Sequence, residues 1–283
     1  MKENIENMRV QTKFGISQGR LTSSSQLQRF PSEAWQLEFS NAQKLGITFI
    51  ELLTERQFNN DNPVWSEHGR REIADVCAAT NREIYSICID YIIDHSMLND
   101  VSRATLIHVE QVLLAASDLG CKIVIFPLLE KSNLDLNSVD QFVDIFRELS
   151  AKASKYGLTI CVESVMKAND LVAFLERVNK DNVKAVFDTG NRVIERDGRD
   201  LHGEILRLNK FIKHIHIKDK NSEGENVILG TGLVDFRSVF SALRDIGYRG
   251  PLNFETTRGR DPLETAAFHI SLCEFFRNEV SEL

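Results

Sequence analysis

The sequence predicts an α/β protein, a single (β/α)8 barrel of the TIM-barrel type, on three observations. Eight short β-rich runs alternate with helical patterns along the 283 residues. Several of these runs carry Val and Ile on both faces, as parallel strands covered on both sides do. No Pro-, Ser- or Gly-rich linker and no low-complexity tract divides the chain, so one domain of this size is expected.

The predicted strands follow one another from end to end of the sequence. Their runs are KFGIS (13–17), ITFIELL (47–53), EIYSICID (83–90), CKIVIFP (121–127), LTICVES (158–164), VKAVFD (183–188), FIKHIHIK (211–218) and PLNFE (251–255). A glycine falls just before four of the runs, at a common helix-to-strand junction. These glycines are Gly46, Gly120, Gly157 and Gly247.

Helical periodicity fills the intervals between the strand runs. Phe142, Phe146 and Leu149 recur at helical spacing, and Gly157 is placed to end that helix. The segments 106–116 and 266–273 carry similar apolar stripes. The alternation of strands and helices therefore continues to the C-terminal part of the chain.

A doubly wound open sheet is the alternative fold with this alternation. If it bound a dinucleotide, it would need G-x-G-x-x-G after a strand. The only close string, LGTGLVD (229–235), lies late in the chain and lacks the third glycine. We therefore expect the barrel domain over residues 13–283, preceded by a flexible N-terminal tail over residues 1–12.

The composition is ordinary for a soluble protein. The net charge of -7 and the pI near 5.6 argue against a nucleic-acid or membrane-surface protein, which usually shows a basic face. No apolar run approaches the ~20 residues of a membrane span, and the N-terminus lacks the apolar segment of a signal peptide. The five cysteines are scattered and form no C-x-x-C pair, which indicates buried thiols in a reducing compartment. We expect a cytoplasmic enzyme.

Ionisable side chains gather at the predicted strand ends, where a barrel of this type has its active site. They are Glu51, Asp90, Glu163, Asp188, His216, Lys218 and Glu255. Carboxylates that converge must share protons or bind a cation, although strand-end acids also form structural ion pairs. Glu163, Asp188, His216 and Glu255 offer three carboxylates and one imidazole, a set that suits Mn²⁺, Mg²⁺ or Co²⁺ and does not exclude Zn²⁺.

Other polar and aromatic residues near the strand ends can be explained by structural roles alone. In the extended run 212–220, His214, His216 and Lys218 share one face, and His214 lies deeper, as a hydrogen-bonded core histidine would.

Glu51 and Asp90 are expected to pair with Arg20 or a lysine. His95 is a candidate to line the barrel mouth, whereas the histidines at 68, 108, 202 and 269 are expected on the surface. Trp35 and Phe39 are expected in the core, and Trp65 over the mouth.

Five strings in order, CVES (161–164), FDTGN (187–191), HIHIKD (214–219), LGTGLVDF (229–236) and NFE (253–255), resemble the xylose isomerase-like TIM-barrel superfamily. The N-terminal GISQGRL (15–21), followed by FP, W and EF, resembles its sugar-phosphate isomerase/epimerase branch. The resemblance spans the chain from about residue 14. It implies that Glu163, Asp188, His216 and Glu255 match the family's metal ligands, and that one divalent ion is bound, with Mn²⁺ the first expectation.

The resemblance further implies proton abstraction next to a ketose carbonyl, with an enediolate stabilised by the metal. Glu163 and Glu255 are the expected acid/base pair, in which one carboxylate removes the proton and the other returns it. Lys218 is expected to neutralise an oxyanion or hold a phosphate. Asn191 stands where many ketose epimerases of the superfamily have a histidine, and can bind a substrate hydroxyl or phosphate. Arg20, Arg258 and His95 are further candidates for substrate binding.

The expected function is that of a metal-dependent isomerase or epimerase of a ketose or ketose phosphate. A metal-dependent dehydratase of a keto-polyol, such as a keto-cyclitol, is the alternative, because enolate formation is common to both. An endonuclease is disfavoured because the connection 219–232 lacks the histidines that its three-metal site needs. A sugar sensor without catalysis would have no reason to hold three buried acids. A small sugar or sugar phosphate is the expected partner, without nucleic acid or membrane, in a homodimer or homotetramer.

Overall fold

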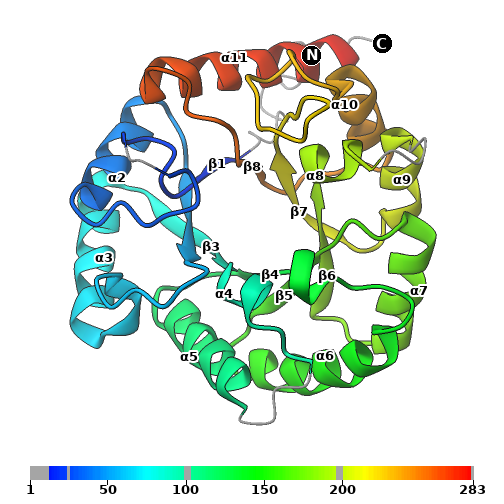
Figure 1. The fold of residues 1–283 in the computed structure, drawn as a ribbon. Helices are drawn as coiled ribbons and strands as arrows, with labels where there is room; N and C mark the ends of the chain where they lie inside the picture. Colours follow the sequence, from blue (N-terminus) through cyan, green and yellow to red (C-terminus); the bar gives the residue numbers. More distant parts are fainter. Residues whose placement is uncertain (1–12, 24–25, 99–102, 196–199, 282–283) are drawn as a thin grey trace, which may run out of the picture.

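The strands close into a parallel barrel with helices arranged around it (Figure 1). The computed structural model describes residues 13–23, 26–98, 103–195 and 200–281. The predicted tail, 1–12, lies outside these residues. The predicted TIM barrel is confirmed.

Each strand pairs in parallel with the next one along the chain, and the last pairs with the first. This order brings the C-terminal ends of all the strands to one end of the barrel, where their side chains can converge. The strands are β1 (Phe14–Ser17), β2 (Phe49–Thr54), β3 (Glu83–Ile89), β4 (Ile123–Pro127), β5 (Thr159–Glu163), β6 (Val183–Asp188), β7 (Ile212–Ile217) and β8 (Leu252–Phe254).

Long helices form the outer layer, and short ones follow some of the strands directly (Figure 1). The outer helices are α2 (Trp35–Lys44), α3 (Glu67–Thr80), α5 (Ala104–Asp118), α6 (Val139–Ser154), α7 (Ala168–Val178), α9 (Leu201–Leu208), α10 (Phe236–Asp245) and α11 (Pro262–Ser281). The short elements are η1 (Pro63–Trp65), α4 (Tyr91–Asp94), η2 (Glu130–Ser132) and α8 (Thr189–Val193).

The main core lies between the strands and the outer helices. The predicted stripe of α6 is buried, and the ring of Phe146 packs 5.5 Å from Phe126 on β4 and 5.8 Å from Phe174 on α7, centroid to centroid. Burying an aromatic side chain of this kind stabilises the fold by about 1.5–3 kcal/mol. Trp35 and Phe39 belong to the same core, as predicted.

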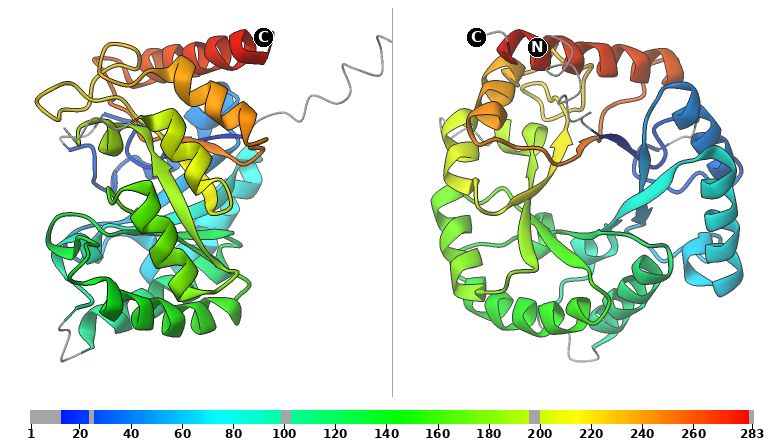
Figure 2. Two further views of the ribbon diagram at one scale, coloured as in Figure 1. Left: turned by 90° about the vertical axis from the view of Figure 1, so that its right-hand side faces the viewer. Right: turned by 180° about the vertical axis from the view of Figure 1, so that it is seen from behind.

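The connections after the strands build the end of the barrel at which the strands terminate. In the side view, the yellow connection between β7 and α10 projects at one end of the molecule (Figure 2). Asp219 fixes this connection, because its buried carboxylate accepts hydrogen bonds from the backbone N–H groups of Gly230, Gly232 and Val234.

The cysteines and the hydropathy of the helices can be compared with the predictions from composition. All five cysteines are free thiols, and four of them are buried, while Cys77 is half-buried. Among the described helices, none combines the length and the apolar character that crossing a membrane requires.

Candidate metal centre

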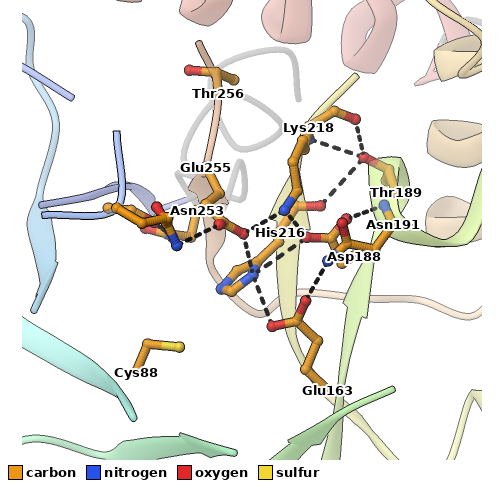
Figure 3. A network of polar contacts seen from close by, with 12 residues as sticks. Cys88, Glu163, Asp188, Thr189, Asn191, His216, Lys218, Asn253, Glu255 and Thr256 are labelled. Atoms are coloured by element: carbon orange, nitrogen blue, oxygen red, sulfur yellow. Dashed lines mark hydrogen bonds and ion pairs between the residues drawn. The ribbon is translucent and has the colours of Figure 1, made fainter. Parts of the chain in front are cut away.

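Four strand ends bring Glu163, Asp188, His216 and Glu255 together inside the barrel mouth (Figure 3). Glu163 and Asp188 are the last residues of β5 and β6, His216 lies near the end of β7, and Glu255 directly follows β8. The register pairs Asp188 directly with His216. All four residues are buried, so their charges are largely removed from water and must be balanced within the protein.

The carboxylates converge on one nitrogen of the histidine. His216 Nδ1 lies 3.0 Å from Glu255 Oε2, 3.6 Å from Asp188 Oδ2 and 3.7 Å from Glu163 Oε2. Nδ1 nevertheless forms no hydrogen bond of good geometry with any of them. One ligand atom from each of the four residues lies within 4.8 Å of the others. A ring nitrogen and three hard oxygens in this arrangement could hold one divalent cation.

The other nitrogen of His216 faces a second carboxylate, that of Glu51. His216 Nε2 lies 3.1 Å from Glu51 Oε1, and His214 Nε2 lies 2.9 Å from Glu51 Oε2. The same carboxylate accepts hydrogen bonds from Ser17 Oγ, Ser86 Oγ and Asn253 Nδ2. Glu51 is therefore saturated with donors from β1, β3, β7 and β8.

The prediction for Glu51 was wrong in position and partner. Glu51 lies in the middle of β2, inside the barrel, and pairs with two histidines instead of Arg20 or a lysine. Burial acts to raise the pKa of Glu51, but the charge of His216 and the hydrogen bond from His214 outweigh it and hold the pKa well below its usual value. The prediction that His214 is a buried, hydrogen-bonded histidine is confirmed.

Lys218 bridges two of the four candidate ligands. Its Nζ lies 2.9 Å from Asp188 Oδ2 and 2.9 Å from Glu255 Oε2, instead of pairing with Glu163 or near Asp219 as a purely structural role predicted. Thr189 fixes its backbone: the Lys218 N–H donates to Thr189 Oγ1. Burial acts against the charged ammonium, yet the two carboxylates outweigh it and raise the pKa of Lys218.

The two predicted acid/base residues have different electrostatic surroundings. Burial raises the pKa of Glu163 to about 8, although His216 acts against this shift. Burial also acts to raise the pKa of Glu255, but Lys218 and His216 hold it well below its usual value. A divalent cation would add its own positive charge to the field at both carboxylates.

Asn191 connects two of the candidate ligands. Its side-chain amide donates to Glu163 Oε1 at 2.7 Å, and its backbone N–H donates to Asp188 Oδ1 at 2.7 Å, which caps the first turn of α8. The residue therefore orients both carboxylates, and its side-chain amide lies against Glu163.

The family model of the xylose isomerase-like TIM barrel matches residues 39–274. The chain belongs to this family. An L-ribulose 3-epimerase from Methylomonas is 39% identical over 85 residues, which cover 30% of this chain and only 28% of that protein. An L-ribulose-5-phosphate 3-epimerase from Escherichia coli is 24% identical over 241 residues, covering 79% of this chain and 82% of that protein. The structure also resembles a xylose isomerase-like barrel from Mycobacterium smegmatis solved in complex with magnesium, with a TM-score of 0.72, 19% identity and coverage of 95% and 98% of the two chains.

Arg20 is buried in this family member. Its Nε donates to the carbonyl oxygen of Thr256 at 2.9 Å, and its remaining nitrogens contact the carbonyl oxygen of Leu27 and the side chain of Gln28. Arg20 Nη2 also lies 3.7 Å from Glu255 Oε1. These contacts orient Glu255 and the connection after β1, and substrate binding by Arg20 stays a prediction.

Gln28 is a site residue that the sequence did not single out. Its Nε2 donates to Glu255 Oε1 at 3.1 Å and to Asp90 Oδ2 at 3.2 Å, while its Oε1 accepts from Arg20. Burial raises the pKa of Asp90 to about 6, and the charge of Glu255 adds to this shift. Gln28 lies in a connection without periodicity, so no sequence pattern indicated that it reaches Glu255.

Arg192 and Glu204 form a second arrangement that the sequence did not predict. Both are buried, and Arg192 Nε donates to Glu204 Oε2 at 2.7 Å. The other guanidinium nitrogens donate to the carbonyl oxygens of Ser164 and Met166, directly after Glu163. This ion pair fixes the connection that follows β5 and with it the position of Glu163.

The remaining predicted substrate residues lie farther along the mouth connections. Arg258 is half-buried and donates to the carbonyl oxygen of Thr22 at 3.2 Å. His95 is half-buried, with its ring stacked 3.9 Å from that of Tyr91 and its Nδ1 3.0 Å from the Tyr91 carbonyl oxygen. Both residues stay candidates for substrate binding.

The prediction of four surface histidines was wrong for two of them. His108 is buried with its ring 3.9 Å from that of Tyr91, and His269 is buried where its Nε2 accepts the N–H of Leu229. Burial lowers the pKa of both histidines to about 4. Trp65, expected over the mouth, packs against Phe58 and His108.

Proposed function

We propose that the protein is a divalent-metal-dependent epimerase or isomerase of a ketose or ketose phosphate. The observation that carries the proposal is the convergence of three buried carboxylates on His216 Nδ1. Two of these carboxylates, Glu163 and Glu255, come from strand ends that are not neighbours in the closed sheet. They approach the centre from different sides, as two groups must if one removes and the other returns a proton on opposite faces of a carbon.

The donor set fits the metal that the family implies. Glu163, Asp188, His216 and Glu255 would hold the ion, with Mn²⁺ the first expectation and Mg²⁺, Co²⁺ or Zn²⁺ as alternatives. When bound, the ion would act as a Lewis acid that polarises the ketose carbonyl and the adjacent hydroxyl. The Mycobacterium smegmatis protein in complex with magnesium supports a hard cation in a barrel of this fold.

In the proposed reaction, one of the two glutamates removes the proton from the carbon next to the carbonyl, and the other returns it. Return to the same carbon from the opposite face gives an epimer, whereas return to the neighbouring carbon gives an aldose–ketose isomer. Lys218, between Asp188 and Glu255, places a positive charge where an oxyanion would develop. Asn191 presents an amide at Glu163 that can exchange its hydrogen bond for one with a substrate hydroxyl.

The named relatives support epimerisation within this class. The Methylomonas protein is an L-ribulose 3-epimerase, and the Escherichia coli protein is an L-ribulose-5-phosphate 3-epimerase. We therefore place C3 epimerisation first and keep dehydration of a keto-polyol as the alternative. We expect a small sugar or sugar phosphate as the partner, in the cytoplasm and without nucleic acid or membrane. A homodimer or homotetramer stays a prediction.

The test is a panel of ketoses and ketose phosphates incubated in D₂O with Mn²⁺ and followed by NMR. We expect deuterium at C3 together with the C3 epimer, because the proton that returns comes from an exchangeable carboxyl group. Deuterium at C2 of an aldose product would indicate isomerisation, and loss of water would indicate the dehydratase. Glu255→Gln should lower kcat by about 10²–10⁴-fold and leave the circular dichroism spectrum unchanged. Near-normal exchange in this variant would contradict the acid/base assignment.

A further inference from the structure

An open cavity of about 550 Å³ is lined in part by Gln28, which also contacts Glu255 of the candidate metal centre. Its wall is formed by residues 26–29 of the connection between β1 and α2, including Gln28, and by the connection between β2 and η1, including Gln57, Phe58, Asn59 and Asn60. Both connections follow strands, so the cavity belongs to the active-site end of the barrel. Its volume falls within the range of about 300–1,000 Å³ that small-molecule sites occupy.

One side chain links this cavity to the reacting carboxylate. Gln28 lines the cavity, and its amide reaches Glu255 Oε1 at 3.1 Å and Asp90 Oδ2 at 3.2 Å. Gln28 therefore connects the cavity to the carboxylate at which the proposed function places the carbonyl end of a ketose. The mechanism described above assigns no role to this space.

The wall combines neutral amides with an exposed aromatic ring. Phe58 is 50% exposed, and the ring of Trp65 supports it at 5.0 Å, centroid to centroid. Small-molecule pockets are typically lined by aromatic side chains together with a few polar groups. The flat ring can pack against the C–H face of a sugar, while amides both donate to and accept from hydroxyl groups.

The wall carries two arginines, Arg29 and Arg56, and two acids, Glu55 and Asp61, so its formal charges balance, which favours a neutral ligand over a phosphate. Arg56 lines the cavity, but its guanidinium is held by Asp94 at 2.8 Å and by Glu130 at 2.6 Å. Glu55 and Asp61 also line the cavity and would repel an anion.

The connection that carries Phe58 is held in shape by hydrogen bonds. Glu55 accepts from the Asn59 side-chain amide at 2.9 Å and from the backbone N–H of Phe30 at 3.3 Å. The side chain of Asn62 donates to the carbonyl oxygen of Leu53 and caps η1. The connection that carries Phe58 is thus held both to the end of β2 and to the connection after β1. Because this connection is already ordered, binding a ligand on Phe58 costs little conformational entropy.

We propose that this cavity is a subsite for a neutral sugar residue joined to the far end of the ketose, so that the substrate class includes glycosylated ketoses. The inference rests on the proposed function, because it places the ketose carbonyl at the metal centre. The second sugar ring packs on Phe58 and hydrogen-bonds the surrounding amides. Gln28 lies at the junction between the two sugar residues.

The experiment compares two probes with the same reacting end, D-fructose and isomaltulose, which is fructose with a glucosyl group on O6. We expect the Mn²⁺-loaded protein to exchange the C3 proton of isomaltulose with a higher kcat/KM than that of D-fructose. Phe58→Ala should lower the ratio of the two kcat/KM values by about tenfold, because the contact with an aromatic ring is lost. Phe275→Ala removes a similarly exposed ring, 56% exposed on α11, and should leave the ratio unchanged.

Saturation-transfer NMR separates this proposal from the proposed function. Contact of the glucosyl protons of isomaltulose with the protein, weakened in Phe58→Ala, would support the subsite even if no ketose of the panel exchanged its C3 proton. Exchange with D-fructose, but no glucosyl contact and an unchanged ratio in Phe58→Ala, would overturn the subsite and leave the epimerase intact. A wild-type kcat/KM for isomaltulose below that for D-fructose would also overturn it.

Discussion

His216 lies between two sets of carboxylates, one on each ring nitrogen. Glu51 contacts Nε2 at 3.1 Å, and the three candidate metal ligands lie 3.0–3.7 Å from Nδ1. A histidine that ligates a metal commonly donates its other N–H to a carboxylate, which fixes the tautomer and raises the basicity of the ligating nitrogen. In the proposed metal centre, Glu51 would position His216 for the ion; with His214 and His216 it also forms a second group of possible ligand atoms within 4.8 Å of one another.

Replacing Glu51 tests this positioning role. Glu51→Gln keeps the size of the side chain but removes the charge that faces Nε2, so we expect the affinity for Mn²⁺ to fall about 10–100-fold. Isothermal titration calorimetry on the metal-free protein measures this directly. Ser86→Ala, which removes only one hydrogen bond to Glu51, serves as the control and should have a smaller effect. An unchanged Mn²⁺ affinity in Glu51→Gln would contradict the assignment.

The sequence identified the ligand-type residues of the cluster, but not all of the residues that contact them. The alternation in 212–218 predicted that His214, His216 and Lys218 share a face, and the structure places all three inside the barrel or its mouth. The contacts of Glu51 and Gln28 could not be predicted, because they join segments 163 and 227 residues apart. Such contacts depend on strand register and on irregular connections, which periodicity does not encode.

Helix α2 carries a buried carboxyl group that holds the turn after β1. Glu38 accepts hydrogen bonds from the backbone N–H groups of Gly19 and Leu21 and from the hydroxyl of Thr22. Gly19 has φ +83°, a conformation that favours glycine, so this position of the turn requires a glycine. This turn presents Arg20 to Glu255, and α2 thereby contributes to the shape of the candidate metal centre.

The buried carboxyl group of Glu38 should make the stability of the protein depend on pH. Burial raises the pKa of Glu38 from its usual 4.5 to about 7, so the folded protein binds this proton more tightly than the unfolded chain. The stability that the proton contributes is complete below about pH 4.5 and is lost as the pH rises through 7. Glu38→Gln cannot titrate, so its free energy of unfolding relative to wild type should increase from pH 5 to pH 8. Urea unfolding at the two pH values measures the difference, and a constant difference would refute the prediction.

The regular elements were more predictable than the connections between them. Every predicted strand run overlaps an observed strand, because short β-rich runs, several with a preceding glycine, are a strong local signal. The short elements η1, α4, η2 and α8 were not predicted, since segments of three to five residues are too short to show a helical period. The buried pair of Arg192 and Glu204 was missed for a different reason: charged residues on helices are usually exposed.

The closed barrel explains why residues from the second half of the chain meet at one point. Parallel pairing from β5 to β8 places four consecutive strand ends side by side, and each contributes one ligand-type side chain. Because the alternation of strands and helices determines this topology, the sequence could predict the cluster once the barrel was inferred. The cavity beside it could not be predicted, because its wall comes from two connections of irregular structure.

The central claim is that this cluster is a metal centre, and the most direct measurement is the metal content of the protein purified without chelators. Elemental mass spectrometry should find about one divalent ion per chain, because the four residues form a single O₃N donor set. His216→Ala should lose the ion, because it removes the nitrogen that faces all three carboxylates. No metal in the wild-type protein, even after soaking with Mn²⁺, would mean that the buried acids are structural and would contradict the account.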